Sequence, residues 1–72
     1  MVANTPLTAL ISAREKKGLS QAELGRRVGV TPQHMQLIEA GKRRPSLDVA
    51  LEVASLLGED VEALFPKLEK IA

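Results

Sequence analysis

Seventy-two residues make a single small domain, residues 1–72, which on folding buries only about 60% of the surface that its unfolded chain exposes. The sequence contains no cysteine, which excludes a disulfide framework and a thiolate metal site and fits a reducing compartment. It shows no signal-peptide pattern and no apolar run close to the roughly 20 residues that span a bilayer. We therefore expect a cytoplasmic protein that does not contact membranes.

The net charge of +1 conceals a strong asymmetry along the chain. Residues 1–46 carry eight Lys or Arg and three Asp or Glu, a net charge of +5, whereas residues 47–72 carry two and six, a net charge of −4. This separation predicts that the first part faces a polyanion and that the second part faces elsewhere. Solvated helix faces also carry charge, so the asymmetry alone does not distinguish a nucleic-acid surface from an ordinary one.

The first predicted helix begins at Thr5 and Pro6, a capping residue followed by a proline suited to the first helical position. Gly18 ends this helix, directly after two lysines whose positive charges suit the negative end of the helix dipole. The apolar residues that recur at helical spacing between these limits are Leu7, Leu10 and Ile11.

The second and third predicted helices have clear capping signals. Ser20 and Glu23 form a capping-box pattern that opens the second helix, and Gly29 ends it, because the chain must turn there with a positive φ. Thr31, which is followed by a proline, opens the third helix, and this helix ends at Gly41. Two short helices joined by a tight turn therefore occupy about residues 20–40.

A fourth helix is predicted from its cap at Ser46 to Gly58, and a short fifth helix begins at Asp60 and is interrupted at Pro66. No segment alternates apolar and polar residues for long enough to predict a strand. The sequence therefore predicts an all-α fold, a compact bundle of five helices. The residues expected on the inner face of the fourth helix are Leu47, Ala50, Leu51, Ala54 and Leu57.

The second and third helices are expected to pack against each other. Gly25 lies where a larger side chain would keep the two helices apart. The third helix is expected to contribute few residues to the core. A small domain that exposes one helix in this way usually inserts it into a DNA groove. The apolar positions that would lock the pair together are Leu24, Val28, Val30, Met35 and Ile38.

The chain resembles the phage repressor and Cro-like family, also called the xenobiotic-response-element family, from about residue 7 to residue 65. In order, the resemblance includes the segment LSQAEL, the small residue Gly25, the Val-Gly-Val turn around Gly29, the segment IEAGKRRPSL and the segment GEDVEALF. It implies the lambda-repressor-like DNA-binding fold, with the third helix as the recognition helix in the major groove. It also implies a bacterial or phage-encoded protein associated with the nucleoid.

The resemblance implies base contacts from the start and the outer side of the third helix. Gln33 is the strongest candidate, because a glutamine amide can bind N6 and N7 of adenine together. Pro32 and Leu37 depart from the polar or basic residues that many relatives carry, which implies that phosphates supply much of the affinity. Leu37 either contacts thymine methyl groups or packs on a neighbouring side chain. The complete set of predicted base contacts is Thr31, Pro32, Gln33, Gln36 and Leu37.

Phosphate contacts are predicted from residues that flank the motif. Gln21 opens the second helix, whose N-terminal amides favour anions. The resemblance implies that this glutamine braces the recognition helix and touches the DNA backbone. The basic loop after the third helix would lie along the same strand and contact its phosphates, the alternative being a solvated loop. The resemblance also implies an ion pair between Arg14 and Glu39 that ties the first helix to the third and leaves the arginine near a phosphate. The predicted phosphate contacts are Arg14, Gln21, Lys42, Arg43 and Arg44.

The sequence predicts no enzyme, no cofactor and no metal site. His34 is the single histidine, and a metal would need further converging ligands, so we interpret it as a surface residue near DNA. No nucleophile–base pair, phosphate-cradling glycine loop or paired-carboxylate motif is evident.

These observations predict a sequence-specific regulator of transcription that binds double-stranded DNA, most simply a repressor. One recognition helix covers only a few base pairs, so we expect a homodimer on a palindromic operator, with the two helices about 34 Å apart. We place the dimer interface in the segment 60–72, although Leu64 and Phe65 could instead be ordinary core residues. The interface residues predicted are Val61, Leu64, Phe65, Leu68 and Ile71.

Three alternatives keep the same fold. The chain could be the antitoxin of a toxin–antitoxin pair, with a toxin as its protein partner, or a controller protein beside a restriction–modification system. It could also be an adaptor that uses this fold for protein contacts only. The concentration of cations around the third helix argues against the adaptor.

Overall fold

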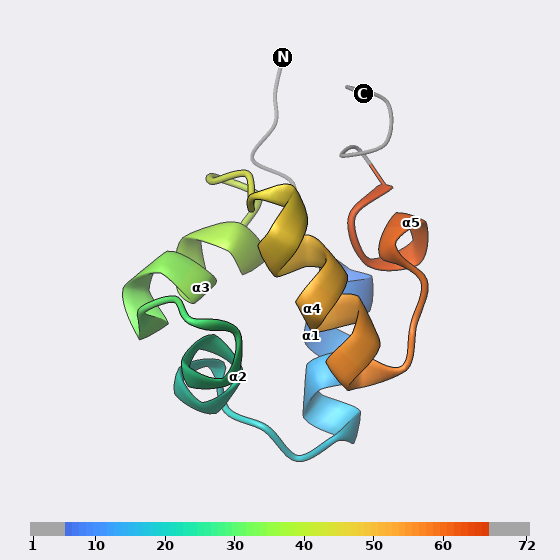
Figure 1. Ribbon diagram of the computed structural model, residues 1–72, viewed down its shortest axis with the longest axis horizontal. Coiled ribbons are helices and arrows are strands. Elements are labelled where there is room, and N and C mark those ends of the chain that lie inside the picture. The colour runs from blue at the N-terminus through green and yellow to red at the C-terminus, as the bar shows by residue number, and fades with distance from the viewer. Residues whose placement is uncertain (1–5, 67–72) are drawn as a thin grey trace.

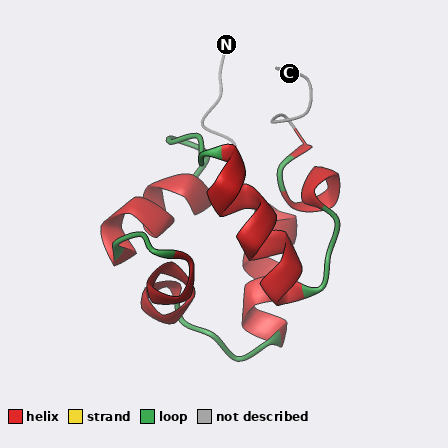
Figure 2. Ribbon diagram, in the orientation of Figure 1, coloured by secondary structure: helices red, strands yellow, loops and turns green. Residues whose placement is uncertain are grey.

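The structure is a computed structural model that describes residues 6–66, and within these residues every regular element is a helix (Figures 1 and 2). In Figure 1, α2 and α3 lie to one side of α4, and α5 lies to the other. The predicted all-α bundle of five helices is confirmed. The elements are α1 (Thr8–Lys16), α2 (Gln21–Val28), α3 (Pro32–Glu39), α4 (Leu47–Leu57) and α5 (Val61–Leu64).

One hydrophobic core joins all five helices. α2 packs most extensively against α3, while α1 contacts α3 and α5, and α4 contacts α2 and α5. No helix within residues 6–66 is long and apolar enough to cross a bilayer. The buried apolar residues are Leu10, Leu24, Met35, Ile38, Ala50, Val53, Ala54, Leu57, Leu64 and Phe65.

The predicted caps of α2, α3 and α4 are present as side-chain hydrogen bonds. At α2, the Ser20 hydroxyl accepts a hydrogen bond from the backbone N–H of Glu23, and the Glu23 carboxylate accepts one from the backbone N–H of Ser20. The Thr31 hydroxyl accepts from the third residue of α3 at 3.0 Å, and the Ser46 hydroxyl does the same for α4 at 3.2 Å. Each cap satisfies a backbone donor that the helix itself leaves free, so these helix starts are set locally.

The predicted start of the first helix was wrong. The helix begins at Thr8, and its N-cap position, Leu7, has no side-chain cap. The backbone N–H of Leu7 donates instead to the carbonyl oxygen of Glu39 at 2.8 Å. This contact with the end of α3 keeps Pro6 out of the helix, whereas Thr5 lies outside the described residues.

The predicted inner face of α4 was wrong at two positions. Leu47 and Leu51 are 63% and 50% exposed, and Val53 is buried in their place. The helix is therefore rotated so that a different apolar row faces the core, formed by Ala50, Val53, Ala54 and Leu57. Adjacent apolar rows leave the rotation of a helix open until its neighbours are known.

Candidate nucleic-acid interface

The turn between α2 and α3 is tight because two glycines permit it. Gly29 has a φ of +84°, a left-handed conformation that costs other residues energy. Gly25 is buried, and a Cβ built on it would lie 2.8 Å from the carbonyl oxygen of Val30. The amide of Val30 also donates to the carbonyl of Gly25 at 2.8 Å. The chain after the turn thus lies directly on the backbone of α2, which sets the angle between the two helices.

The inner side of α3 anchors it to the body of the protein. Met35 and Ile38 are buried, together with Leu24 from α2, while Val28 and Val30 are half-buried against the same core. These are the five positions that the sequence predicts to lock the pair. The packing leaves the opposite side of α3 in solvent.

The structure places all five predicted base-contacting residues on this exposed side or at the exposed start of α3. The side chain of Leu37 is 38% exposed, so it belongs to the surface of the helix. The Thr31 hydroxyl is engaged as the cap, and His34 is half-buried in the first turn. The surface so formed, which we call the α3 outer face, consists of Thr31, Pro32, Gln33, Gln36 and Leu37.

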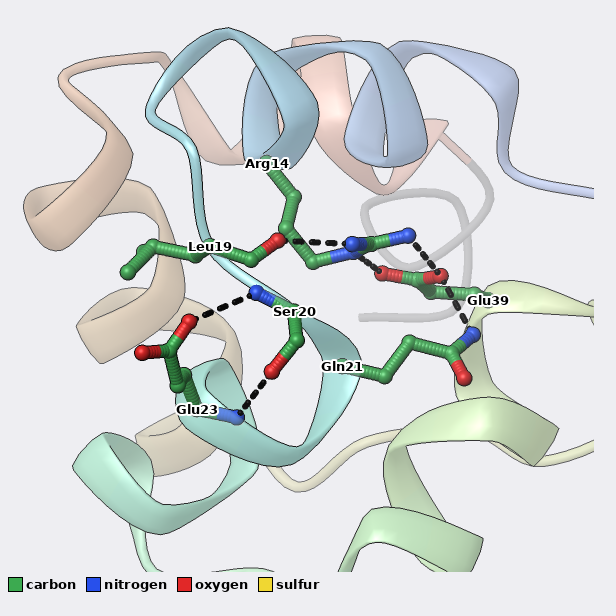
Figure 3. Close-up of polar contacts among 6 residues, drawn as sticks. All are labelled: Arg14, Leu19, Ser20, Gln21, Glu23 and Glu39. Atoms are coloured by element: carbon green, nitrogen blue, oxygen red, sulfur yellow. Dashed lines mark hydrogen bonds and ion pairs between the residues drawn. The ribbon is translucent and has the colours of Figure 1, made fainter.

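A buried polar network holds the other end of α3 (Figure 3). Arg14 Nε lies 2.6 Å from Glu39 Oε2, and Arg14 Nη2 donates to Glu39 Oε1 at 3.2 Å. The third guanidinium nitrogen donates to the carbonyl of Leu19 at 2.8 Å. The exposed fraction is 11% for the Arg14 side chain and 2% for that of Glu39, so the pair is shielded from water.

Gln21 completes the network by donating from Nε2 to Glu39 Oε1 at 2.8 Å. The carboxylate therefore receives donors from both α1 and α2, and no buried side-chain nitrogen or oxygen within residues 6–66 lacks a partner. A fully satisfied network of this kind is rigid and fixes the position of α3 against the bundle. Because all three nitrogens of Arg14 donate inside the protein, its predicted phosphate contact has little exposed surface available and stays a prediction.

The sequence does not predict two further contacts that hold α1 and α3 in place. Both involve the backbone: the Leu19 carbonyl that accepts from Arg14, and the Glu39 carbonyl that accepts from Leu7. Every residue has these groups, so no residue type could have indicated them.

The three cations that follow α3 form an exposed basic loop, Lys42, Arg43 and Arg44. The start of the loop is fixed to the helix, because the amide of Lys42 donates to the Leu37 carbonyl and that of Gly41 to the Ile38 carbonyl, both at 3.0 Å. Among residues 6–66 the loop cations form no ion pair.

The start of α2 carries a negative group, the carboxylate of Glu23. The hydrogen bond from the backbone N–H of Ser20 lowers the pKa of Glu23 below its ordinary value.

Of the predicted dimer interface, the structure describes Val61, Leu64 and Phe65. Leu64 and Phe65 are 1% and 3% exposed and belong to the core, and Val61 is half-buried. Leu68 and Ile71 lie outside the described residues. The interface in this segment remains a prediction.

The arrangement of α2, turn and α3 is that of a helix-turn-helix, and comparison with known families agrees with it. A family model described as helix-turn-helix matches residues 10–64. The chain belongs to this family, which is the Cro/C1-type helix-turn-helix family.

The names of similar proteins indicate which kind of helix-turn-helix protein this chain is. A protein from Methanothermobacter thermautotrophicus, named an uncharacterized HTH-type transcriptional regulator, is 42% identical over 59 residues, which are 81% of this chain and 86% of the relative. One of the same name from Archaeoglobus fulgidus is 36% identical over 58 residues, 81% of this chain and 83% of the relative. The protein is a DNA-binding transcriptional regulator of the helix-turn-helix class.

A solved structure has the same fold. The crystal structure of the restriction-modification controller protein C.AhdI from Aeromonas hydrophila superimposes with a TM-score of 0.70 at 33% sequence identity. The match covers 81% of this chain and 88% of that chain.

Proposed function

We propose that the protein is a sequence-specific repressor that binds a palindromic operator as a homodimer and inserts α3 into the major groove. The observation that carries the proposal is the combination of an exposed α3 outer face with a rigidly held helix. The outer face offers two side-chain amides, Gln33 and Gln36, and one apolar side chain, Leu37. Amides can bind adenine through N6 and N7, and an apolar group can contact the thymine methyl, so these side chains favour A·T pairs.

Phosphate contacts set the register of α3 on the duplex in this proposal. The basic loop, Lys42 to Arg44, begins at the last turn of α3 and is exposed throughout. The cations of this loop would neutralise phosphates beside the groove. They lie at the opposite end of α3 from Gln33. Each neutralised phosphate releases a counterion, so affinity should fall steeply with salt concentration.

Gln21 has a second role in this proposal. Its amide nitrogen is engaged with Glu39, which holds the side chain at the start of α2. The backbone N–H groups of that turn that the Ser20 cap leaves free would then be open to a phosphate, and the ordered side chain limits the entropy lost on binding.

A second candidate, a controller protein of a restriction–modification system, is favoured by the structural match to C.AhdI, which carries that description. The two candidates share DNA binding and differ in the regulated gene. The genes that lie beside the selected binding site separate them, because a controller requires restriction or modification genes there and a repressor of other genes does not.

Selection from a library of random duplexes at physiological salt tests the proposal. We expect enrichment of a two-fold-symmetric sequence with half-sites about one helical turn, roughly 34 Å, apart. Salt-sensitive binding without any enriched sequence would contradict it, because phosphate attraction alone carries no sequence information. The matched control is Arg14→Met/Glu39→Met, which retains the α3 outer face but loses the polar network that positions it.

A further inference from the structure

Leu37 is an apolar residue on the surface that the proposed function places against base edges. It is 38% exposed, and the amide of Gln33, one turn earlier on the same face, is exposed beside it. The other large apolar side chains with high exposure in the described part of the chain are Leu47 and Leu51, which lie on α4. Leu37 is therefore the one of these leucines that the proposed DNA contact would cover.

The backbone holds Leu37 in a fixed place on the α3 outer face. The next residue, Ile38, is 1% exposed in the core, so α3 cannot turn about its axis without moving that side chain. The carbonyl oxygen of Leu37 accepts a hydrogen bond from the amide of Lys42 at 3.0 Å, which ties the residue to the first cation of the basic loop. A loop that binds phosphates would thus also fix the position of Leu37 in the groove.

The chemistry of a leucine side chain limits what it can recognise on a base edge. Leucine contacts apolar groups but cannot donate or accept a hydrogen bond. The apolar group that the major groove offers is the C5-methyl of thymine. Cytosine methylated on C5 presents the same group from the same ring position, beside an N4 donor in place of the O4 acceptor of thymine. Because Leu37 cannot distinguish that donor from that acceptor, its contact depends on the methyl group alone.

We propose that Leu37 makes the protein sensitive to cytosine methylation: 5-methylcytosine replaces thymine as its partner, and methylation of a cytosine at that position raises affinity. The inference rests on the proposed function, in which the α3 outer face contacts base edges. It adds a chemical modification of the operator as a signal that the protein detects. An unmodified cytosine or a uracil at the same position leaves the leucine without an apolar partner.

The geometry of α3 limits where the methyl group lies. Gln33 and Leu37 are four residues apart on one side of the helix, a distance of about 6 Å along its axis. Successive bases of one strand lie about 3.4 Å apart. The methyl group should therefore lie within about two base pairs of the adenine that Gln33 contacts, on either strand.

Affinity measurements on modified forms of the selected operator test the proposal at constant salt. At each pyrimidine position of the half-site in turn, the base pair is T·A, U·A, C·G or 5-methylcytosine·G, with the same change in the other half-site. At one position, the ratio of affinities for T·A and U·A should equal the ratio for 5-methylcytosine·G and C·G. Burial of one methyl group corresponds to a ratio of about fourfold per half-site, and about 15-fold for the two half-sites together.

Leu37→Gln is the test variant, because glutamine has a similar length and replaces the methyl groups by an amide. Leu51→Gln is the matched control, since it makes the same change at an exposed leucine of α4, outside the α3 outer face. Both methyl ratios should fall to about 1 in Leu37→Gln and should keep their wild-type values in Leu51→Gln. Thermal unfolding, followed by circular dichroism, checks that both variants are folded. If Leu37→Gln is unfolded, Leu37→Ser takes its place with the same expected ratios.

Three results would overturn the proposal. The first is a methyl ratio near 1 at every pyrimidine in the wild type. The second is a ratio that remains unchanged when Leu37 is replaced, which would assign the methyl contact to another residue. The third is a thymine ratio without the matching cytosine ratio, which would confine the contact to thymine.

Random duplexes separate failure of this inference from failure of the proposed function. A wild-type protein that prefers the operator to random DNA but is insensitive to the methyl group refutes the role of Leu37 alone. A wild-type protein that binds the operator and random duplexes equally refutes the proposed function, and this inference with it.

Discussion

Loss of the Arg14 guanidinium should show how strongly α3 depends on the buried network. Arg14→Met keeps an unbranched apolar stem and removes every hydrogen bond that the guanidinium makes. Glu39 would then keep Gln21 as its remaining side-chain donor, through the 2.8 Å bond to Oε1. We expect lower stability, and weaker DNA binding, because α3 loses its side-chain tie to α1.

The expected loss of stability follows from the charge on Glu39, which the substitution leaves without its cation. Removing one member of a buried ion pair costs about 3–5 kcal/mol, because the remaining charge has lost its partner. Water entering the space left by Arg14, whose side chain is already 11% exposed, would offset part of this cost, so we take about 3 kcal/mol. A domain of 72 residues has a total stability of about 4–11 kcal/mol. At about 4–8 °C per kcal/mol, Tm should fall by about 12–24 °C.

Thermal and urea unfolding, followed by circular dichroism at neutral pH, measure the loss. Lys16→Met is the matched control, because it removes an exposed cation from the same helix and should change stability by less than about 0.5 kcal/mol. In Arg14→Met/Glu39→Met no charge is stranded, so at least half of the lost stability should return. An Arg14→Met protein that melts within about 3 °C of the wild type would refute the reasoning, as would a double variant no more stable than the single one.

Other perturbations test the turn, the cap and the DNA contacts. Gly25→Ala places a Cβ 2.8 Å from a backbone oxygen, so urea unfolding should show a loss of about 1–3 kcal/mol. The pKa of Glu23 is lowered by its bond to the backbone of Ser20, so its contribution to stability is present above the unfolded value of 4.5 and is lost as pH falls through the folded pKa. The difference in Tm between wild type and Glu23→Gln should therefore shrink below that pH, and a constant difference would contradict this origin. Arg43→Gln should lower the slope of log affinity against log salt by about 1 and weaken all duplexes alike. Gln33→Ala should cost about 1–3 kcal/mol on the selected operator and relax selection at one base pair, with random DNA as the control.

The local signals in the sequence predicted most of the helix boundaries correctly. Ser20, Thr31 and Ser46 each satisfy a backbone donor within three residues, so their effect is contained in a few neighbouring positions. Gly29 ends α2 for an equally local reason, its positive φ. The fold class follows from such signals together with helical periodicity.

Long-range contacts explain what the sequence did not predict. The first helix starts at Thr8, two residues later than expected, because Leu7 binds the carbonyl of Glu39, 32 positions along the chain. The rotation of α4 that exposes Leu47 and Leu51 depends on the shapes of α2 and α5, the helices on which it packs. The Arg14–Glu39 pair was expected only through the resemblance to a family, since no spacing rule relates residues so far apart.

The most direct test of major-groove recognition by α3 is a chemical double-mutant cycle between Gln33 and one adenine. Affinity is measured for the selected operator and for the same duplex with 7-deazaadenine, which lacks the N7 acceptor, at each adenine in turn. The account predicts one position per half-site where the change costs the wild type about 1–3 kcal/mol and costs Gln33→Ala nothing further. Equal losses in both proteins at every adenine, or no loss anywhere, would contradict it.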